Sequence, residues 1–338
     1  MRTNVYLTID TENSMGGAWA DPCLRPVSAD RRIFCQINGK SYGIGWMCRE
    51  LNARKLEATF FAEVFGTLVF GEDETRRWFQ YLLDQGQDVQ LHTHLNFYYY
   101  ARRTEVPGDL ARRTDNLADL EPPLRGELVD RACELFRRAA GHDATAYRAG
   151  NWRGSRALLR DLGARGIVVD ASFNRSLQGH GSFDNEPIVV NALQLVDGVW
   201  ELPITVAHQR LPDPVLTDGL RPFDPVSLSC WELRKVLDDA YTSGTTHISA
   251  VFHCFSGVKA KDLQYKQLKP DHIVRRRFEF LLDYLAANQD RFCVSTIGKL
   301  VNEIRYTPGS MAPHASIPSL GFFRPLARKV VQAANSLY

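Results

Sequence analysis

The chain has 338 residues, of which 44% are apolar and 24% are charged, as in an ordinary soluble globular protein. Its 41 basic and 39 acidic residues leave a net charge of +2, which argues against a dedicated nucleic-acid-binding protein. The seven cysteines are odd in number and none are paired at C-x-x-C spacing, so neither a disulfide framework nor a zinc ribbon is expected. No apolar run is long enough to span a membrane.

The N-terminal segment lacks the features of a secretory signal. Residues 1–10 contain no apolar core of signal-peptide length and no small-residue cleavage site. Together with the unpaired cysteines, this predicts a protein of the cytoplasm with reduced thiols.

Short β-rich runs alternate with amphipathic runs through most of the chain. This alternation predicts a β/α architecture with a largely parallel sheet. Strands are expected at residues 5–9, 58–61, 88–92, 146–148, 167–170, 200–203, 248–253 and 292–295. Helices are expected at residues 44–53, 74–85, 124–140, 155–162, 270–288 and 297–304, and a long loop at residues 13–42.

The composition changes near residue 306. A Pro-, Ser- and Gly-rich linker follows, and residues 322–337 then have apolar side chains at helical spacing with basic residues between them. We therefore expect a β/α unit over residues 1–306 and a linker with an amphipathic helix over residues 307–338. That helix would lie on a membrane surface at its inner face, or pack on the barrel or a partner subunit.

Polar residues follow several of the predicted strands. In β/α barrels the C-terminal ends of the strands carry the functional groups. The residues in question are Asp10, His92, Arg148, Asp170 and His253.

Two short clusters stand out among these strand ends. Asp10 and Glu12 lie two residues apart, so both carboxylates face one pocket if the chain stays extended. His92 and His94 have the same spacing, and two imidazoles on one side of an extended segment suit a shared metal ion. The competing interpretations are a helix cap or solvated turn for the carboxylates and a pair of surface or hydrogen-bonded side chains for the histidines.

The order and spacing of these motifs resemble the polysaccharide deacetylase family, also called the NodB-homology domain or carbohydrate esterase family 4. The resemblance covers residues 3–305. Its motifs are Thr8-Ile9-Asp10-Thr11 for T-F-D-D, 58–61 for A-T-F-F, 86–93 for the strand ending in H-[ST], Arg148 with Trp152, and Phe252-His253. The resemblance implies a distorted (β/α)7-type barrel and a metal-dependent hydrolase that removes N-acyl groups from sugars.

Two positions depart from the family pattern. Thr11 stands where the family has a metal-binding aspartate, and Asn96 stands where it has a second histidine. Glu12 and His94 are the available replacements, so the implied ligands are Glu12, His92 and His94, although Asp10 is an alternative carboxylate ligand. One carboxylate and two imidazoles suit zinc, with cobalt, nickel or iron as alternatives.

The resemblance also implies catalytic roles. Asp10 would be the general base, oriented and kept ionised by Arg148. His253 would be the general acid that protonates the departing amine. Asp170 would hydrogen-bond His253 and raise its pKa, unless Arg148 and Asp170 form only a structural ion pair.

Three aromatic residues are expected to bind substrate. Trp152 and Phe255 would line the acyl pocket. Tyr98, within the aromatic run at residues 97–100, would stack on a sugar or simply pack a loop.

Three functions remain open at this stage. The first is removal of an N-acyl group, acetyl above all, from a small amino-sugar compound or a nucleotide- or lipid-linked glycan inside the cell. The second is hydrolysis of a non-sugar amide or ureide, with or without metal. The third is a non-catalytic binding role on the same fold.

Overall fold

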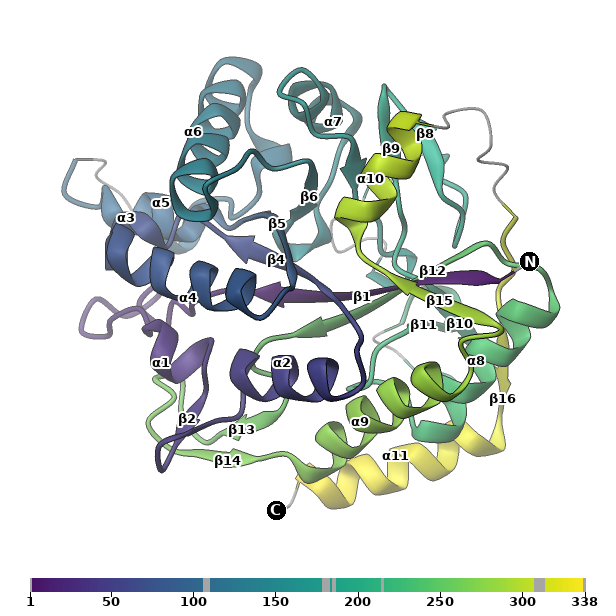
Figure 1. Cartoon of the computed structure of the whole chain (residues 1–338). Helices are drawn as coiled ribbons and strands as arrows, with labels where there is room; N and C mark the ends of the chain where they lie inside the picture. Colours follow the sequence, from purple (N-terminus) through teal and green to yellow (C-terminus); the bar gives the residue numbers. More distant parts are fainter. Residues whose placement is uncertain are drawn as a thin grey trace.

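The computed structural model describes residues 2–105, 110–177, 183, 187–213, 216–306 and 314–336. A curled, mainly parallel sheet forms its centre, with strand order β12-β1-β4-β5-β6-β7-β9-β8, and β15 also pairs with β1 (Figure 1). The strands are β1 (Thr3–Thr11), β4 (Thr59–Glu63), β5 (Asp88–Thr93), β6 (Ala146–Ala149), β7 (Val169–Asp170), β8 (Gln194–Val196), β9 (Val199–Glu201), β12 (His247–His253) and β15 (Phe292–Ser295).

The sheet curls far enough to bring its two ends together. Thr205, just past β9, donates its backbone N–H to the carbonyl of Ser249 in β12 at 3.0 Å. On the other edge of β1, β15 pairs with the first half and β4 with the second, so the ring is irregular. The predicted distorted β/α barrel is therefore confirmed.

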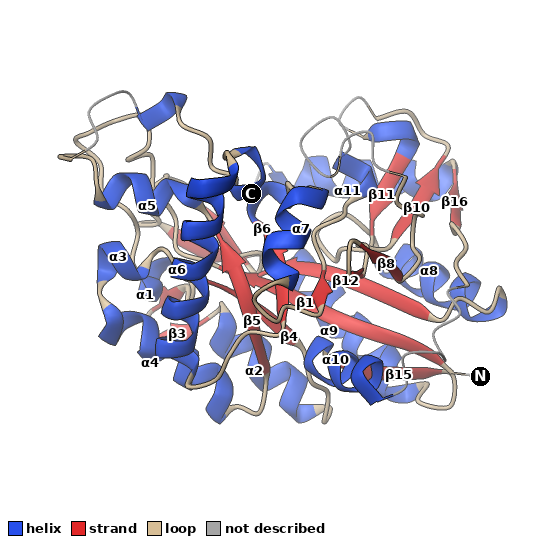
Figure 2. Cartoon of the chain, turned by 90° about the horizontal axis from the view of Figure 1, so that it is seen from above, coloured by secondary structure: helices blue, strands red, loops and turns tan. Residues whose placement is uncertain are grey.

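Helices surround the barrel on its outer face (Figure 2). The main ones are α2 (Ile44–Ala53), α4 (Glu72–Asp84), α6 (Pro122–Ala140), α7 (Arg156–Gly163), α8 (Cys230–Thr242), α9 (His272–Ala287) and α10 (Ile297–Tyr306). Shorter ones are α1 (Ala29–Arg32), α3 (Thr67–Phe70), α5 (Leu95–Ala101) and the 3-10 turns Leu110–Arg112, Leu117–Asp119, Gly150–Trp152, Arg175–Leu177 and Thr217–Gly219.

Successive side chains of β1 point to opposite faces and pack into two different clusters of buried residues. Val5, Leu7 and Ile9 pack outward in the large core under the helices. Tyr6 belongs instead to a smaller core with residues of α10. Since successive side chains of a strand face opposite ways, Asp10 lies on the same side as Tyr6, at the C-terminal end of the barrel interior.

Local signals explain where several helices begin and end. Pro122 starts α6, where its missing N–H costs nothing, and Gly141 ends it with a φ of 80°. Ser229 and Glu232 form a reciprocal capping box at the start of α8, and Asp271 caps α9 by accepting two backbone N–H groups.

Three sequence expectations needed correction. The segment 13–42 was expected to be a loop, but it contains α1 and the hairpin β2 (Gln36–Ile37) and β3 (Lys40–Ser41). The aromatic run at 97–100 lies in α5, because its rings pack on the core of the barrel wall. Helix α8 was not predicted, although its buried residues have helical spacing.

The C-terminal segment is attached to the barrel wall. The strand β16 (Ser319–Gly321) joins β10 (Val206–Gln209) and β11 (Leu220–Pro222) in a small sheet, and α11 (Phe323–Ser336) follows it. The predicted amphipathic helix is thus present and packs on the barrel. Residues 307–313 lie outside the described part, so the boundary between parts 1–306 and 307–338 stays a prediction.

The second hairpin is β13 (Val258–Ala260) with β14 (Leu268–Pro270).

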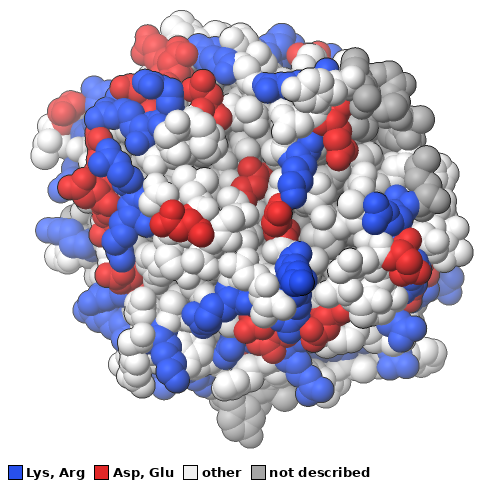
Figure 3. Space-filling view, viewed as in Figure 1, with Lys and Arg blue, Asp and Glu red and all other residues white. Residues whose placement is uncertain are grey.

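Basic and acidic residues are interspersed on the face shown in Figure 3. This matches the net charge of +2. None of the described helices is both long enough and apolar enough to cross a bilayer. All seven cysteines are free.

Candidate metal centre and catalytic site

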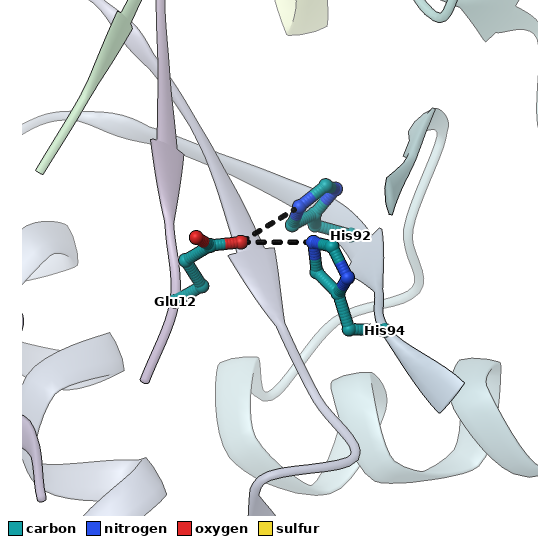
Figure 4. A group of neighbouring side chains, drawn as sticks. All are labelled: Glu12, His92 and His94. Atoms are coloured by element: carbon teal, nitrogen blue, oxygen red, sulfur yellow. Dashed lines mark ion pairs between the residues drawn. The ribbon is translucent and has the colours of Figure 1, made fainter. Parts of the chain in front are cut away.

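Glu12, His92 and His94, the ligand set that the family resemblance implies, meet at the C-terminal end of the barrel (Figure 4). Glu12 follows β1, while His92 belongs to β5 and His94 lies just past it. One Glu12 oxygen, Oε2, is 2.9 Å from His94 Nε2 and 3.5 Å from His92 Nε2. These three ligand atoms lie within 4.8 Å of one another.

The other ring nitrogen of each histidine is held by a neighbour. His92 Nδ1 donates to the backbone carbonyl of Arg148 at 2.7 Å, and His94 Nδ1 lies 2.6 Å from a carboxylate oxygen of Asp115. These contacts turn both Nε2 atoms toward Glu12. A histidine that ligates a metal is oriented in this way, so the cluster fits a divalent cation.

Burial and charge compete at this cluster. Burial raises the pKa of Glu12, but His94 and the hydrogen bonds from both imidazoles lower that pKa well below its usual value. Burial lowers the pKa of His94, but Asp115 and Glu12 raise it well above its usual value. Before a cation binds, the cluster is therefore held together as an ion pair.

Asp10 and Arg148 form a buried ion pair beside the cluster. Arg148 Nη1 donates to Asp10 Oδ1 at 2.6 Å, and both side chains are almost inaccessible to solvent. The guanidinium also donates to Thr8 Oγ1 at 2.8 Å and to the Ala171 carbonyl at 2.9 Å, and it lies 4.2 Å from the Phe61 ring centroid. With so many contacts, Arg148 fixes the position of the Asp10 carboxylate.

His253 faces Asp10 from the next strand. Asp10 and His253 are register partners in β1 and β12, so their side chains emerge on the same side of the sheet. The second carboxylate oxygen, Asp10 Oδ2, is 3.7 Å from His253 Nε2. Burial lowers the pKa of His253, and this effect is opposed by Asp10 and Glu12.

The expected contact between Asp170 and His253 is wrong. Asp170 accepts a hydrogen bond from Ser172 Oγ at 2.6 Å and is the register partner of Glu201 in β9. Burial raises the pKa of both carboxyl groups, and the neighbouring Asp170 carboxylate raises that of Glu201 further, well above its usual value. Asp170 therefore interacts with the neighbouring strand β9, and the carboxylates that raise the pKa of His253 are Asp10 and Glu12.

Two of the three predicted aromatic residues lie at the site. The Trp152 ring centroid is 6.2 Å and the Phe255 ring centroid 5.1 Å from that of His253. Trp152 has a φ of 60°, a conformation that costs energy and that clusters at functional sites. Tyr98 packs instead on Phe65, so its role in substrate binding stays a prediction.

Three functional neighbours escaped the sequence interpretation. Arg32, from α1, donates to Glu12 Oε1 at 3.1 Å and lies 3.1 Å from the Phe255 ring centroid. Asp115 lies in the segment between α5 and α6. Glu63 accepts from two backbone N–H groups at the end of β4, and burial raises its pKa to about 7. Only Glu63 had a signal, an acidic residue just beyond a predicted strand.

Comparison with solved structures places the fold. A Mycobacterium smegmatis protein assigned as a polysaccharide deacetylase superimposes with a TM-score of 0.51 and 16% identity, over 94% of this chain and 96% of that one. This chain has the polysaccharide deacetylase fold. The family named from its sequence motifs is thus the one whose fold it shares.

Other solved structures superimpose on this chain with lower TM-scores. The PuuE allantoinase has a TM-score of 0.47 and 11% identity, over 90% of this chain and 91% of that one. A carbohydrate esterase family 4 pseudoenzyme from Bacillus anthracis has a TM-score of 0.44 and 10% identity, over 89% of this chain and 66% of that one. No protein-family model and no curated protein sequence matches this chain.

Proposed function

We propose that this protein is a metal-dependent hydrolase that removes an N-acyl group, acetyl above all, from an amino sugar. The observation that carries the proposal is the convergence of one carboxylate and two imidazoles within 4.8 Å, beside a buried Asp10–Arg148 pair. Hydrolysis of an amide needs an activated water, a polarised carbonyl and a proton for the leaving nitrogen. The residues at this site match those needs.

Glu12, His92 and His94 would hold the cation, and their chemistry favours zinc. When bound there, the ion supplies Lewis acidity to the carbonyl and acidity to water. Asp10, oriented by Arg148, would take the proton from the attacking water. His253, in its protonated form, would donate to the departing nitrogen, and its lowered pKa makes it the stronger acid for that step.

The proposed substrate class rests on the residues that line the site. Trp152 and Phe255 flank His253 and would enclose a small acyl group. A small amino-sugar compound, or a nucleotide- or lipid-linked glycan of the cytoplasm, is the proposed substrate class. Tyr98 would contribute a ring for stacking on the sugar. Contact of α11 with the inner membrane face belongs to the same proposal.

The test is release of acetate from a panel of N-acetylated amino sugars by zinc-loaded protein. The double variant His92→Ala, His94→Ala should lose both bound zinc and turnover. His253→Ala should keep its zinc while its rate falls by roughly 10²–10⁴-fold, the usual contribution of general acid catalysis. Normal zinc content in the double variant would refute the ligand set, and no acetate from any sugar would refute the substrate class.

One observation favours a second candidate, a metal-independent amidase acting on a non-sugar amide or ureide. Arg32 Nη2 lies 3.1 Å from Glu12 Oε1, so a cation of the chain itself already neutralises the carboxylate ligand. Activity that survives complete removal of metal by a chelator would select this candidate over the first.

A further inference from the structure

Helix α11 closes a groove of about 520 Å³ against the first turns of α8 and α9. We call it the α11 groove. In Figure 1, α11 crosses these two helices at the lower edge of the barrel. None of the groove's lining residues belongs to the proposed catalytic site, so a ligand here would have a function separate from hydrolysis.

Four arginines line the α11 groove, and no carboxylate does. Arg276 and Arg324 are exposed at its rim, and the described part of the chain shows no ion pair for either. Arg277 is buried and donates to the Val226 carbonyl at 3.1 Å. Arg276 and Arg324 therefore place two positive charges at the rim of the groove that a ligand can neutralise.

Arg328, at the floor of the groove, adds an independent sign of a missing partner. Its side chain is fully buried, and its Nη atoms donate to Ser227 and Gln209 and approach Glu232 at 3.3 Å. Among the residues that the structure describes, its Nε nitrogen finds no hydrogen-bond partner. Burial first, and then the charge of the neighbouring Arg221, lower the pKa of Arg328 to about 10.

The first turns of two helices form part of the wall. Cys230 and Trp231 of α8, and His272 and Ile273 of α9, line the groove. Since Glu232 and Asp271 already cap these two helices, the charge available to a ligand comes from the arginine side chains.

The remaining wall is apolar. Ile273, Ala327 and Val331 line it. The guanidinium of Arg324 lies 4.8 Å from the Trp231 ring centroid, so this pair joins the charged and apolar parts. Val331 is 45% and Trp231 39% exposed, which leaves both free to contact a ligand.

We propose that the α11 groove binds one molecule of an alkyl phosphate ester, with its phosphate on Arg276 and Arg324 and its chain on Ile273, Ala327 and Val331. Phosphate suits this site because several guanidinium groups converge on a single small volume, and guanidinium pairs strongly with phosphate. A free inorganic anion has no chain and would make no contact with the apolar wall. This inference stands whether or not the proposed hydrolase activity is correct.

The test is calorimetric titration with monooctyl phosphate as the probe. Inorganic phosphate has the charge without the chain, and octyl glucoside has the chain without the charge. Both should bind at least about tenfold more weakly than the probe. The double variant Arg276→Glu, Arg324→Glu should lose at least about tenfold in affinity, because each charge-assisted contact is replaced by repulsion. Val331→Asn, which removes apolar surface without adding charge, should weaken the probe but not inorganic phosphate.

Matched controls separate the groove from general effects. Arg137→Glu reverses an exposed arginine of α6, and Val189→Asn changes a valine that is 60% exposed elsewhere. Neither should change the affinity for monooctyl phosphate, and all variants should unfold at similar temperatures. Equal binding of octyl glucoside or of inorganic phosphate overturns the proposal. So does binding only to vesicles of anionic phospholipid, which would indicate a surface contact of α11 instead.

Discussion

At the scale of single residues, Asp115 decides how His94 is presented. Its carboxylate holds His94 Nδ1 at 2.6 Å and also accepts from the backbone N–H of Asn96 at 2.7 Å. One side chain thus couples a proposed ligand to the start of α5. Because Asp115 lies far from His94 in sequence, no local pattern pointed to it.

Replacing Asp115 should weaken metal binding without removing any ligand. We expect Asp115→Asn to lower zinc affinity by roughly 10–100-fold, since loss of such a partner makes a ligating imidazole less basic and less well oriented. Titration against a competing chelator measures this. Asp119→Asn is the control, because Asp119 lies in the same segment but bonds Arg153 and Thr114. Equal losses in both variants would show a general effect on the segment.

The Asp170–Glu201 pair predicts a pH dependence of stability. Burial and Asp170 raise the pKa of Glu201 well above 4.5. As pH rises past the pKa of the unfolded carboxyl, the unfolded chain releases a proton that the folded chain keeps. The free energy of unfolding therefore falls with rising pH, by about 1.4 kcal/mol per unit of difference between the two pKa values.

Glu201→Gln should abolish this loss, because the amide donates to Asp170 without a proton to release. Urea unfolding of both proteins should show that the variant gains stability relative to the parent from about pH 5 upward. The gain should stop once the pH passes the pKa of Glu201 in the folded parent protein. A stability difference that does not change with pH would mean that Glu201 is ionised in the folded protein.

At the scale of elements, the ends of β5 and β6 approach unusually closely. A Cβ atom at Gly150 would lie 2.5 Å from the Thr93 carbonyl and 2.8 Å from His94 Nδ1. Only glycine fits, so the turn after β6 sets the position of the histidine pair.

Gly150→Ala should therefore displace His94 and destabilise the fold by about 1–3 kcal/mol, as expected for overpacking. Zinc affinity should fall with it. Gly126→Ala is the matched control, because its Cβ would meet only the end of the Arg165 side chain at 3.4 Å. That helical substitution should stabilise by about 0.5–1 kcal/mol. Denaturant unfolding and zinc titration check both, and unchanged zinc affinity in Gly150→Ala would contradict the role of the turn.

Some elements were predicted correctly from sequence patterns alone. The helix 44–53 and the strand 292–295 have the bounds that the sequence predicts. Their apolar periodicity is complete within the element, so no distant contact is needed to recognise them. Helix α5 was missed because its aromatic run carries no clear period and only its packing on the barrel makes it helical.

At the scale of the whole molecule, metal binding should couple to global unfolding, because the proposed ligands come from β1 and the region of β5, which only the folded barrel brings together. Free zinc at 100 times its dissociation constant should add about 2.7 kcal/mol of stability. For 338 residues this corresponds to a rise of about 4 °C in Tm. Calorimetry with and without zinc measures it, and the rise should vanish in His92→Ala, His94→Ala. A rise that persists there would place the cation elsewhere.

The sequence by itself determined much of the alternation between strands and helices and the polar residues at the strand ends, among them Glu12, His92 and His94. The barrel class followed from the resemblance of its motifs to a known family. The alternation and the strand-end residues depend on local patterns, which are visible along the chain. The tertiary structure alone decided that Arg32 and Asp115 reach the cluster and that Asp170 pairs with Glu201 rather than His253. Strand register and loop placement come from packing between distant segments, and no short stretch of sequence encodes them.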